Sequence, residues 1–247
     1  MNEPETTVLP LPREADATAR AWLEAGSPQG APPRQAASVC LLRDGDGGPQ
    51  VLWITRGHRL AVAPGLLAFP GGAVDDVDRL RRHDDPGYPD RFTVLARAAV
   101  RELAEETGHR VPDRSLRPLV RWVTPEHEPR RYDSTFLVGR LPDGAVGPAP
   151  ATMPADHEVH EHGWARPAQL LAEVASGARS ALPPTRAVLA RLRDATAGVD
   201  AATAVDTLAA AALLVPVVPR ATWRDPGPAG GPPGVDLLLP RHAGEVP

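Results

Sequence analysis

Residues 92–107 read as a helix whose two ends are both marked in the sequence. Asp90 stands just before them, where an aspartate can accept hydrogen bonds from the first free backbone N–H groups. Gly108 follows, and glycine most readily takes the left-handed conformation that ends a helix. Apolar residues recur at every fourth position from Leu95 to Leu103, so one face can be buried. A fold for this chain must therefore pack this helix against a core.

The same helix carries a dense group of acidic side chains. Glu102, Glu105 and Glu106 lie three and four positions apart and share one face. Like charges at this spacing destabilise a helix by about 0.2–0.5 kcal/mol per pair, and the last two lie where the helix dipole disfavours anions. A hard divalent cation would offset this repulsion, since Mg²⁺ binds carboxylate oxygens and completes its octahedron with phosphates and water. Arg101 could add a charge-assisted hydrogen bond.

A glycine turn upstream favours a metal site over the alternative, a solvated acidic surface. The sequence FPGG ends in Gly71 and Gly72, which permit backbone conformations and close approach that a side chain would block. Pro70 stiffens the entry to this turn. Beside an acidic helix, such a turn predicts a cradle for a metal ion and a phosphate.

Together these segments resemble the Nudix box, G-x5-E-x7-R-E-U-x-E-E-x-G-U, in which U is aliphatic. The residues from Arg101 to Gly108, RELAEETG, match its second half, and His109 takes the place of the last aliphatic residue. In the first half, Gly72 is followed by Asp78 in place of glutamate, and 22 residues rather than seven separate Asp78 from Arg101. The stretch RRHDDPGYPD therefore looks like an insert within the box.

The resemblance implies an α+β fold, the Nudix α/β/α sandwich with a mixed β-sheet, and hydrolysis of a diphosphate linked to another moiety. It implies that Glu102, Glu105 and Glu106 bind Mg²⁺ or Mn²⁺, with Glu102 and Glu105 also acting in catalysis. Arg101 would be catalytic by orienting the glutamates. Asp78 stands where the family has a glutamate of mainly structural importance.

The resemblance also implies roles for the glycine turn and for a later acid. Gly71 and Gly72 would contact the substrate and add a carbonyl ligand. A general base often comes from a later loop in this family, and Glu158, six residues before Trp164, is placed like such an acid, with Glu161 as its rival. The alternative is that both are acids of a surface loop.

The widened box and the later segments are similar to the peroxisomal-type CoA diphosphatases within the Nudix family. CoA-specific members carry a longer signature leading to FPGG; Thr55–Arg56, Leu60 and Gly65 keep its spacing, whereas Gly57 and Ala63 replace its serine and histidine. This similarity favours CoA or acyl-CoA as the substrate. The alternatives are ADP-ribose, NADH or a nucleotide sugar, or a nucleotide-sensing module without catalysis.

Arginine is the only basic side chain besides histidine, because the chain has no lysine. Any other side-chain cation that meets a phosphate must therefore be an arginine. Arg56 precedes the loop leading to FPGG, and Arg131 stands in RRYDSTF; we expect both to bind substrate. The alternative for Arg131 is a surface cation.

The remaining sequence predicts a Pro/Ala-rich N-terminal arm, residues 1–34, with one short helix, and a Nudix hydrolase domain with a C-terminal extension, residues 35–247. The predicted strands are 37–46, 50–57, 117–125, 131–142 and two late runs, 210–223 and 234–240. Further helices are predicted at 166–179 and 184–198, and the polar stretch 154–167 is interpreted as a connector. Strands and helices mix without strict alternation, which favours an α+β fold.

Composition and net charge limit the kinds of partner that this chain is expected to bind. A formal net charge of −4 gives no electrostatic case for nucleic acid or an anionic membrane, so a small-molecule nucleotide diphosphate is the expected partner. The single cysteine, Cys40, lies in an apolar run and fits a reducing compartment. With no secretory signal pattern at the start, we expect a cytoplasmic protein. The family resemblance adds a homodimer as an expectation.

Overall fold

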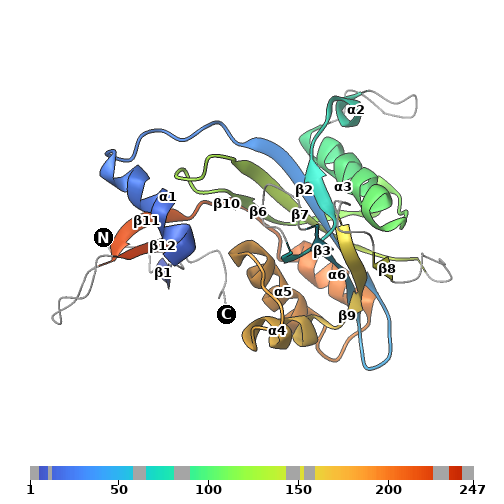
Figure 1. Cartoon of the computed structure of the whole chain (residues 1–247). Helices are drawn as coiled ribbons and strands as arrows, with labels where there is room; N and C mark the ends of the chain where they lie inside the picture. Colours follow the sequence, from blue (N-terminus) through green and yellow to red (C-terminus); the bar gives the residue numbers. More distant parts are fainter. Residues whose placement is uncertain are drawn as a thin grey trace.

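The computed structural model of the whole chain contains two sheets and the helices that cover them (Figure 1). It describes residues 6–10, 13–57, 65–80, 90–142, 151–152, 159–224 and 234–240. The strands are β1 (Thr6–Pro10), β2 (Arg34–Arg43), β3 (Gln50–Arg56), β4 (Leu67–Ala68), β5 (Gly71–Ala73), β6 (Arg117–Val123), β7 (Tyr132–Arg140), β8 (Ala151–Thr152), β9 (Val159–Ala165), β10 (Leu213–Val217), β11 (Arg220–Arg224) and β12 (Gly234–Pro240). The helices are α1 (Arg13–Glu24), α2 (Asp76–Arg79), α3 (Arg91–Thr107), α4 (Pro167–Ala175), α5 (Pro183–Ala195), α6 (Ala201–Ala210) and the short 3₁₀ turn η1 (Asp113–Ser115).

The larger sheet is the middle layer of a sandwich. Among the described residues its order is β10-β6-β7-β2-β3-β9-β8, with β4 paired to β3 and β5 paired to β2. The sheet is mixed, because β2 pairs with β7 and β10 pairs with β6 in parallel, whereas β3 pairs with β2 and β9 antiparallel. α3 covers one face, and α4, α5 and α6 cover the other (Figure 1). This confirms the predicted α+β fold with a mixed sheet between helical layers.

The central strand β2 is buried on both faces. Val39 and Leu41 pack in the apolar cluster beneath α3, while Cys40 and Leu42 pack in the cluster beneath α5. Strands covered on both sides read as continuous apolar runs, which is why SVCLL was recognisable as a strand. Burial also raises the pKa of the Cys40 thiol above its usual range, so this cysteine is a core residue, as predicted.

The predicted ends of α3 are confirmed. The Asp90 side chain accepts a hydrogen bond from the backbone N–H of Thr93 at 2.7 Å, and Gly108 takes a left-handed φ of 72°. The apolar face from Leu95 to Leu103 is buried against β2 and β5. Because this packing fixes the rotation of the helix, the position of its acidic face is fixed too.

Two segments differ from the sequence predictions. The stretch predicted as a polar connector contains β9, which pairs with β3 over Val51 to Arg56. The prediction was wrong because the strand carries polar residues on both faces; His162, for example, is buried and its ring contacts that of His109. Helix α6 was not predicted, although Asp200 caps it by accepting from the backbone N–H of Thr203 at 2.7 Å.

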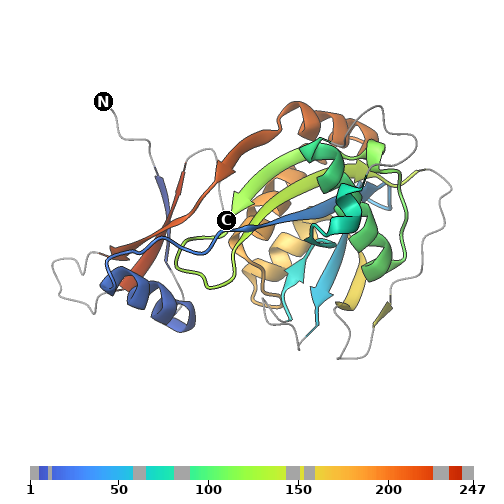
Figure 2. The ribbon, with the colours of Figure 1, turned by 90° about the horizontal axis from the view of Figure 1, so that it is seen from above.

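The two ends of the chain meet in the smaller sheet, whose order is β1-β12-β11. Seen from above, this sheet and α1 lie beside the main body, joined to it through β10 and the segment after α1 (Figure 2). The predicted N-terminal helix is confirmed as α1. The segment predicted as an arm thus pairs with the C-terminal strands, while the boundary itself stays a prediction. In the described ranges, no helix is long and apolar enough to cross a membrane.

Candidate active site

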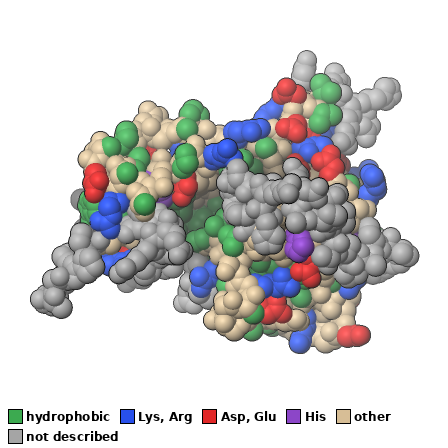
Figure 3. All heavy atoms as spheres, viewed as in Figure 1, with side chains coloured by type: hydrophobic (Ala, Val, Ile, Leu, Met, Phe, Trp, Pro, Cys, Tyr) green, Lys and Arg blue, Asp and Glu red, His purple; other side chains and the backbone are tan. Residues whose placement is uncertain are grey.

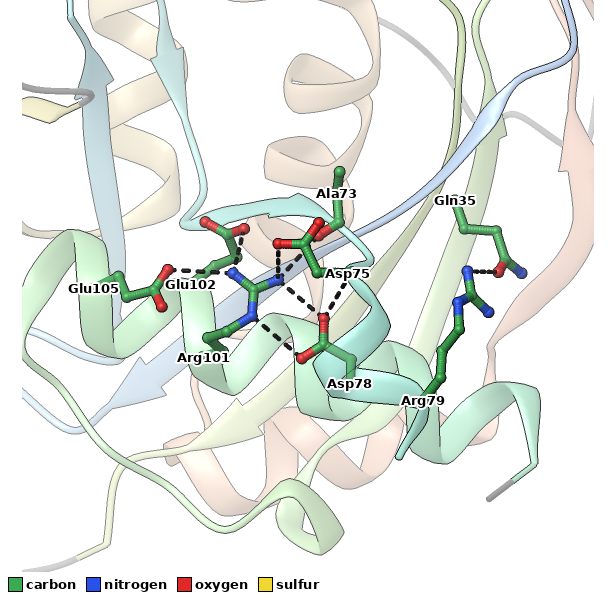
Figure 4. A network of polar contacts seen from close by, with 8 residues as sticks. All are labelled: Gln35, Ala73, Asp75, Asp78, Arg79, Arg101, Glu102 and Glu105. Atoms are coloured by element: carbon green, nitrogen blue, oxygen red, sulfur yellow. Dashed lines mark hydrogen bonds and ion pairs between the residues drawn. The ribbon is translucent and has the colours of Figure 1, made fainter. Parts of the chain in front are cut away.

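Arg101 is the centre of a polar network on the second half of α3 (Figure 4). Its Nε and Nη2 atoms donate to the two carboxylate oxygens of Asp78 at 3.2 and 2.9 Å. Its Nη1 atom donates to Glu102 at 2.9 Å and to Glu105 at 3.2 Å. Nη2 also donates to the backbone carbonyl of Ala73 at 3.0 Å. One guanidinium therefore ties two glutamates of α3 to α2 and to the end of β5.

Asp78 is the buried member of this network. Its side chain is 4% exposed, and one of its oxygens also accepts from the backbone N–H of Asp75 at 2.9 Å, which fixes the start of α2. The Asp78–Arg101 pair joins residues 23 positions apart, across a stretch, 81–89, that lies outside the described residues. The hydrogen bonds to Asp78, and then those to Glu102, raise the pKa of Arg101 above its ordinary value, so the guanidinium stays charged.

Gly71 and Gly72, predicted as a turn, instead begin strand β5, and the backbone of this strand lies close to the glutamates. The Gly71 backbone N–H donates to the Glu106 carboxylate at 2.9 Å. A methyl group on Gly72 would run into the Glu102 carboxylate, and one on Gly71 would run into the backbone of β2. Because β5 pairs with β2, neither strand can withdraw without breaking the sheet. Gly71 is therefore required for the pairing of β5 with β2, and Gly72 leaves room for the Glu102 carboxylate.

Carboxylates are concentrated in this region. Five lie in or beside the network: Asp75, Asp78, Glu102, Glu105 and Glu106. Arg101 pairs with four of them, so in the described part of the network the carboxylates outnumber the guanidinium that contacts them. Carboxylate oxygens are the donors that Mg²⁺ and Mn²⁺ prefer, so the residues fit a divalent metal by charge and donor type. Within the described residues no three acidic, histidine or cysteine side chains already converge as a metal site, since Arg101 and Gly71 hold the glutamates.

His109, which replaces an aliphatic residue of the box, behaves as an apolar group. Its side chain is buried, and its ring meets Trp164 edge-on with centroids 5.4 Å apart. Nδ1 lies 3.2 Å from the hydroxyl of Thr107. Burial lowers the pKa of His109, which favours the neutral ring. A neutral aromatic ring fills the position that the family pattern assigns to an aliphatic side chain.

The two arginines predicted to bind substrate lie in different surroundings. Arg56 ends β3; its backbone N–H donates to the carbonyl of Leu66 at 3.0 Å, and its carbonyl accepts from Gly65 at 2.9 Å. This places Arg56 beside the strand that enters FPGG. Arg131 is buried and donates to the backbone carbonyls of Thr124 at 3.1 Å and Ala31 at 2.7 Å. Arg131 is thus no exposed surface cation, and these bonds fasten the segment after α1 to the main sheet.

The two candidate general bases cannot both be placed. Glu158 lies outside the described residues. Glu161 belongs to β9, opposite Thr55 of β3, and its carboxylate lies 3.7 Å from Nη1 of Arg179. Arg179, whose guanidinium covers the ring of Trp53, was not predicted from the sequence. No local pattern could have found the contact between Arg179 and Trp53, because these two residues are more than a hundred positions apart.

A mixed sheet between two helical layers, with an acidic helix held against the glycine-containing strand β5 by one arginine, defines a hydrolase of the Nudix type. The chain belongs to the NUDIX domain family, whose model matches residues 32–184. The enzyme is accordingly a diphosphatase-type hydrolase, and members of the family generally use divalent metal ions.

The chain is similar to several solved structures of Nudix proteins. A NUDIX hydrolase from Alicyclobacillus acidocaldarius is 27% identical, with a TM-score of 0.55, over 66% of this chain and 92% of that one. The Mycobacterium smegmatis Nudix hydrolase RenU is 23% identical over 65% of this chain and 84% of that one, with a TM-score of 0.39. The NUDIX domain of Shewanella oneidensis NrtR, solved with ADP ribose, is 17% identical over 57% and 78%, with a TM-score of 0.41. A comparison with curated protein sequences finds no match.

Proposed function

We propose that this enzyme hydrolyses the diphosphate of a nucleoside diphosphate linked to another moiety, with CoA or acyl-CoA as its preferred substrate. The observation that carries the proposal is the cluster of carboxylates around Arg101, directly beside Gly71 and Gly72 of β5. Such a site repels a bare diphosphate and accepts one together with divalent cations. Asp78 bonds Arg101 across the widened box, which supports an insert between two halves of one site.

In the proposed mechanism, Glu102, Glu105 and Glu106 hold Mg²⁺ or Mn²⁺. When bound, the metal supplies charge neutralisation for the diphosphate and lowers the pKa of an attacking water. Arg101 keeps Glu102 and Glu105 oriented through its Nη1 hydrogen bonds. Gly71 and Gly72 of β5 leave room for backbone atoms to contact the substrate. Glu158 is the proposed general base, with Glu161 as the alternative.

The preference for CoA rests on the end of β3. The backbone of Arg56 is bonded to Gly65 and Leu66, which brings the signature residues Thr55–Arg56 next to the strand entering FPGG. An arginine there can meet a phosphate of the substrate at a distance from the scissile diphosphate. Arg131 is a weaker candidate, since two backbone carbonyls already engage its guanidinium. ADP-ribose, NADH and nucleotide sugars remain the alternative substrates.

The proposal is tested by a phosphate-release screen with Mg²⁺ and then Mn²⁺. The panel contains CoA, acetyl-CoA, ADP-ribose, NADH and UDP-glucose, with an added phosphatase that detects the released monophosphates. Preferred turnover of CoA to adenosine 3′,5′-bisphosphate supports the CoA proposal. Preferred turnover of another member keeps the diphosphatase and discards CoA. No turnover, with metal bound, favours a nucleotide-sensing module.

We further propose that the protein acts in the cytoplasm as a homodimer. The single buried cysteine and the absence of a long apolar helix among the described residues are compatible with this location. Light scattering of the purified protein tests the dimer, and cell fractionation tests the location.

A further inference from the structure

Arg179 lies in the turn between α4 and α5 and is held on the opposite face of the sheet from α3. Its guanidinium carbon is 4.1 Å from the centre of the Trp53 ring, so the planar cation covers the indole. Nε donates to Glu173 at 2.8 Å, and Nη1 donates to the hydroxyl of Thr55 at 3.2 Å. The side chain is still 25% exposed. Three groups thus fix a guanidinium that is still partly exposed.

The residues that support Arg179 are held in place by the fold. Trp53 is 7% exposed, and its ring lies against Gly163 of β9, where a methyl group would come within 3.0 Å of the indole. The turn that carries Arg179 is tied to β4, because the Leu67 backbone N–H donates to the Ser180 carbonyl at 2.8 Å. A long side chain that is already ordered loses little entropy when a ligand binds. Arg179 is therefore preorganised.

The local charges exclude a simple phosphate site. Arg179 is paired with Glu173, whose pKa is lowered first by its hydrogen bond from Gln169 and also by Arg179, so this acid stays ionised. Glu161 adds a second carboxylate 3.7 Å from Nη1, and it is 40% exposed. Two carboxylates against one guanidinium leave no positive charge for an anion. The surface suits a neutral planar ring that stacks on the guanidinium and donates a hydrogen bond to a carboxylate.

We infer that Arg179 is the stacking surface for the nucleobase of the substrate, and that Glu161 accepts a hydrogen bond from an amino group on the base. The base is one that carries an exocyclic amino group, as adenine does and uracil does not. This inference rests on the proposed function, in which the substrate contains a nucleoside diphosphate. It assigns Glu161 to recognition and leaves Glu158 as the general base. Thr55 and Trp53 act as positioning residues for Arg179.

The test is direct binding of fragments without a scissile diphosphate. Calorimetry with the full chain measures the affinity for AMP, IMP, UMP and ribose 5-phosphate. Stacking of one base contributes about 1–3 kcal/mol to binding. Arg179→Met is therefore expected to weaken the affinity for AMP about tenfold and to leave the affinity for ribose 5-phosphate unchanged. Arg179→Lys, which keeps the positive charge but loses the planar guanidinium, is expected to weaken the affinity for AMP by a similar factor. The matched control is Arg220→Met, an exposed arginine of β11.

A second comparison tests the hydrogen bond between the base and the Glu161 carboxylate. IMP replaces the amino group of AMP with a carbonyl, so the native protein is expected to bind AMP more tightly than IMP. Glu161→Gln is expected to shrink this difference, because an amide can also donate to the carbonyl of IMP. Thermal melts establish that each variant is folded, and Arg179→Lys replaces Arg179→Met if the latter is not.

The results separate this inference from the proposed function. If no diphosphate is cleaved but AMP binding depends on Arg179, the base site stands and the proposed reaction fails. If diphosphates are cleaved and Arg179→Met leaves both the KM values and AMP affinity unchanged, the base site is overturned. Equal affinity of the native protein for AMP, UMP and ribose 5-phosphate also overturns it.

Discussion

The role of each glutamate on α3 follows from how the neighbouring groups hold it. Glu102 is close to the Gly72 backbone and to Arg101, Glu106 accepts from Gly71, and Glu105 is the most exposed of the three. This part of the site was predictable, because its residues are close in sequence and share one helix face. The Arg179–Trp53 pair was not, because its contact depends on the finished fold.

Replacing Glu105 with glutamine removes one charge and almost no volume. We expect kcat to fall about 100-fold, the scale seen when groups that support a metal site are lost. The melting temperature should change little, because the side chain is 60% exposed. Steady-state kinetics with a thermal melt measures both, and Glu24→Gln at the end of α1 is the matched control. An unchanged kcat would remove Glu105 from the metal site.

His109 makes the fold sensitive to acid. Its pKa is lowered by burial, so the ring is neutral in the folded protein, whereas the unfolded ring takes up a proton as the pH falls below about 6.5. Protonation therefore favours unfolding, and stability is lost as the pH falls through that region. His109→Leu should show a smaller drop in melting temperature from pH 7.5 to 5.5. The buried His162, with a similarly lowered pKa, leaves part of the drop in place. Equal drops would mean that His109 does not contribute.

At the level of whole elements, the ends of α3 were readable because capping is local chemistry. β9 could not be predicted from the sequence, because its polar residues do not follow the apolar pattern of a strand and Glu161 meets Arg179 only in the folded chain. Asp200 and the apolar spacing after it are typical of a helix start, and both are present in α6. The alanine-rich sequence of α6, however, continues without a clear boundary into the strand that follows. Local chemistry thus predicts helix ends better than it predicts strands with polar residues.

The widened box offers a test at this scale. The contacts that join its two halves, Asp78 with Arg101 and the Leu80 carbonyl with Arg97 at 2.8 Å, use residues outside 81–89. Replacing 81–89 with a short Gly/Ser linker should therefore shift the melting temperature by less than about 2 °C. A collapse of the melting transition would show that this stretch packs as part of the fold.

For the whole molecule, the small sheet joins the two ends of the chain and stands apart from the network around Arg101. β1 pairs with β12 from Thr6 to Pro10, and none of the network residues comes from either strand. The family pattern predicted the central sandwich, whereas the pairing of the two termini has no local signature, because a strand does not specify a distant partner.

Removing residues 1–10 should therefore separate stability from activity. We expect the melting temperature to fall by about 2–6 °C, since β12 loses an edge partner, while kcat/KM stays within about twofold. Differential scanning calorimetry and steady-state kinetics on the shortened chain measure the two effects. A large loss of kcat/KM in a folded protein would mean that the N-terminal segment contributes to the site.

The measurement that tests the central claim most directly is metal dependence of diphosphate cleavage. The full-length protein is treated with EDTA, assayed on the best substrate of the panel, and then titrated with Mg²⁺ and Mn²⁺. We predict no turnover without metal and full recovery on titration, with recovery lost in Glu105→Gln. Full turnover in EDTA would contradict the account, because the carboxylates around Arg101 would then have a purpose other than holding a metal.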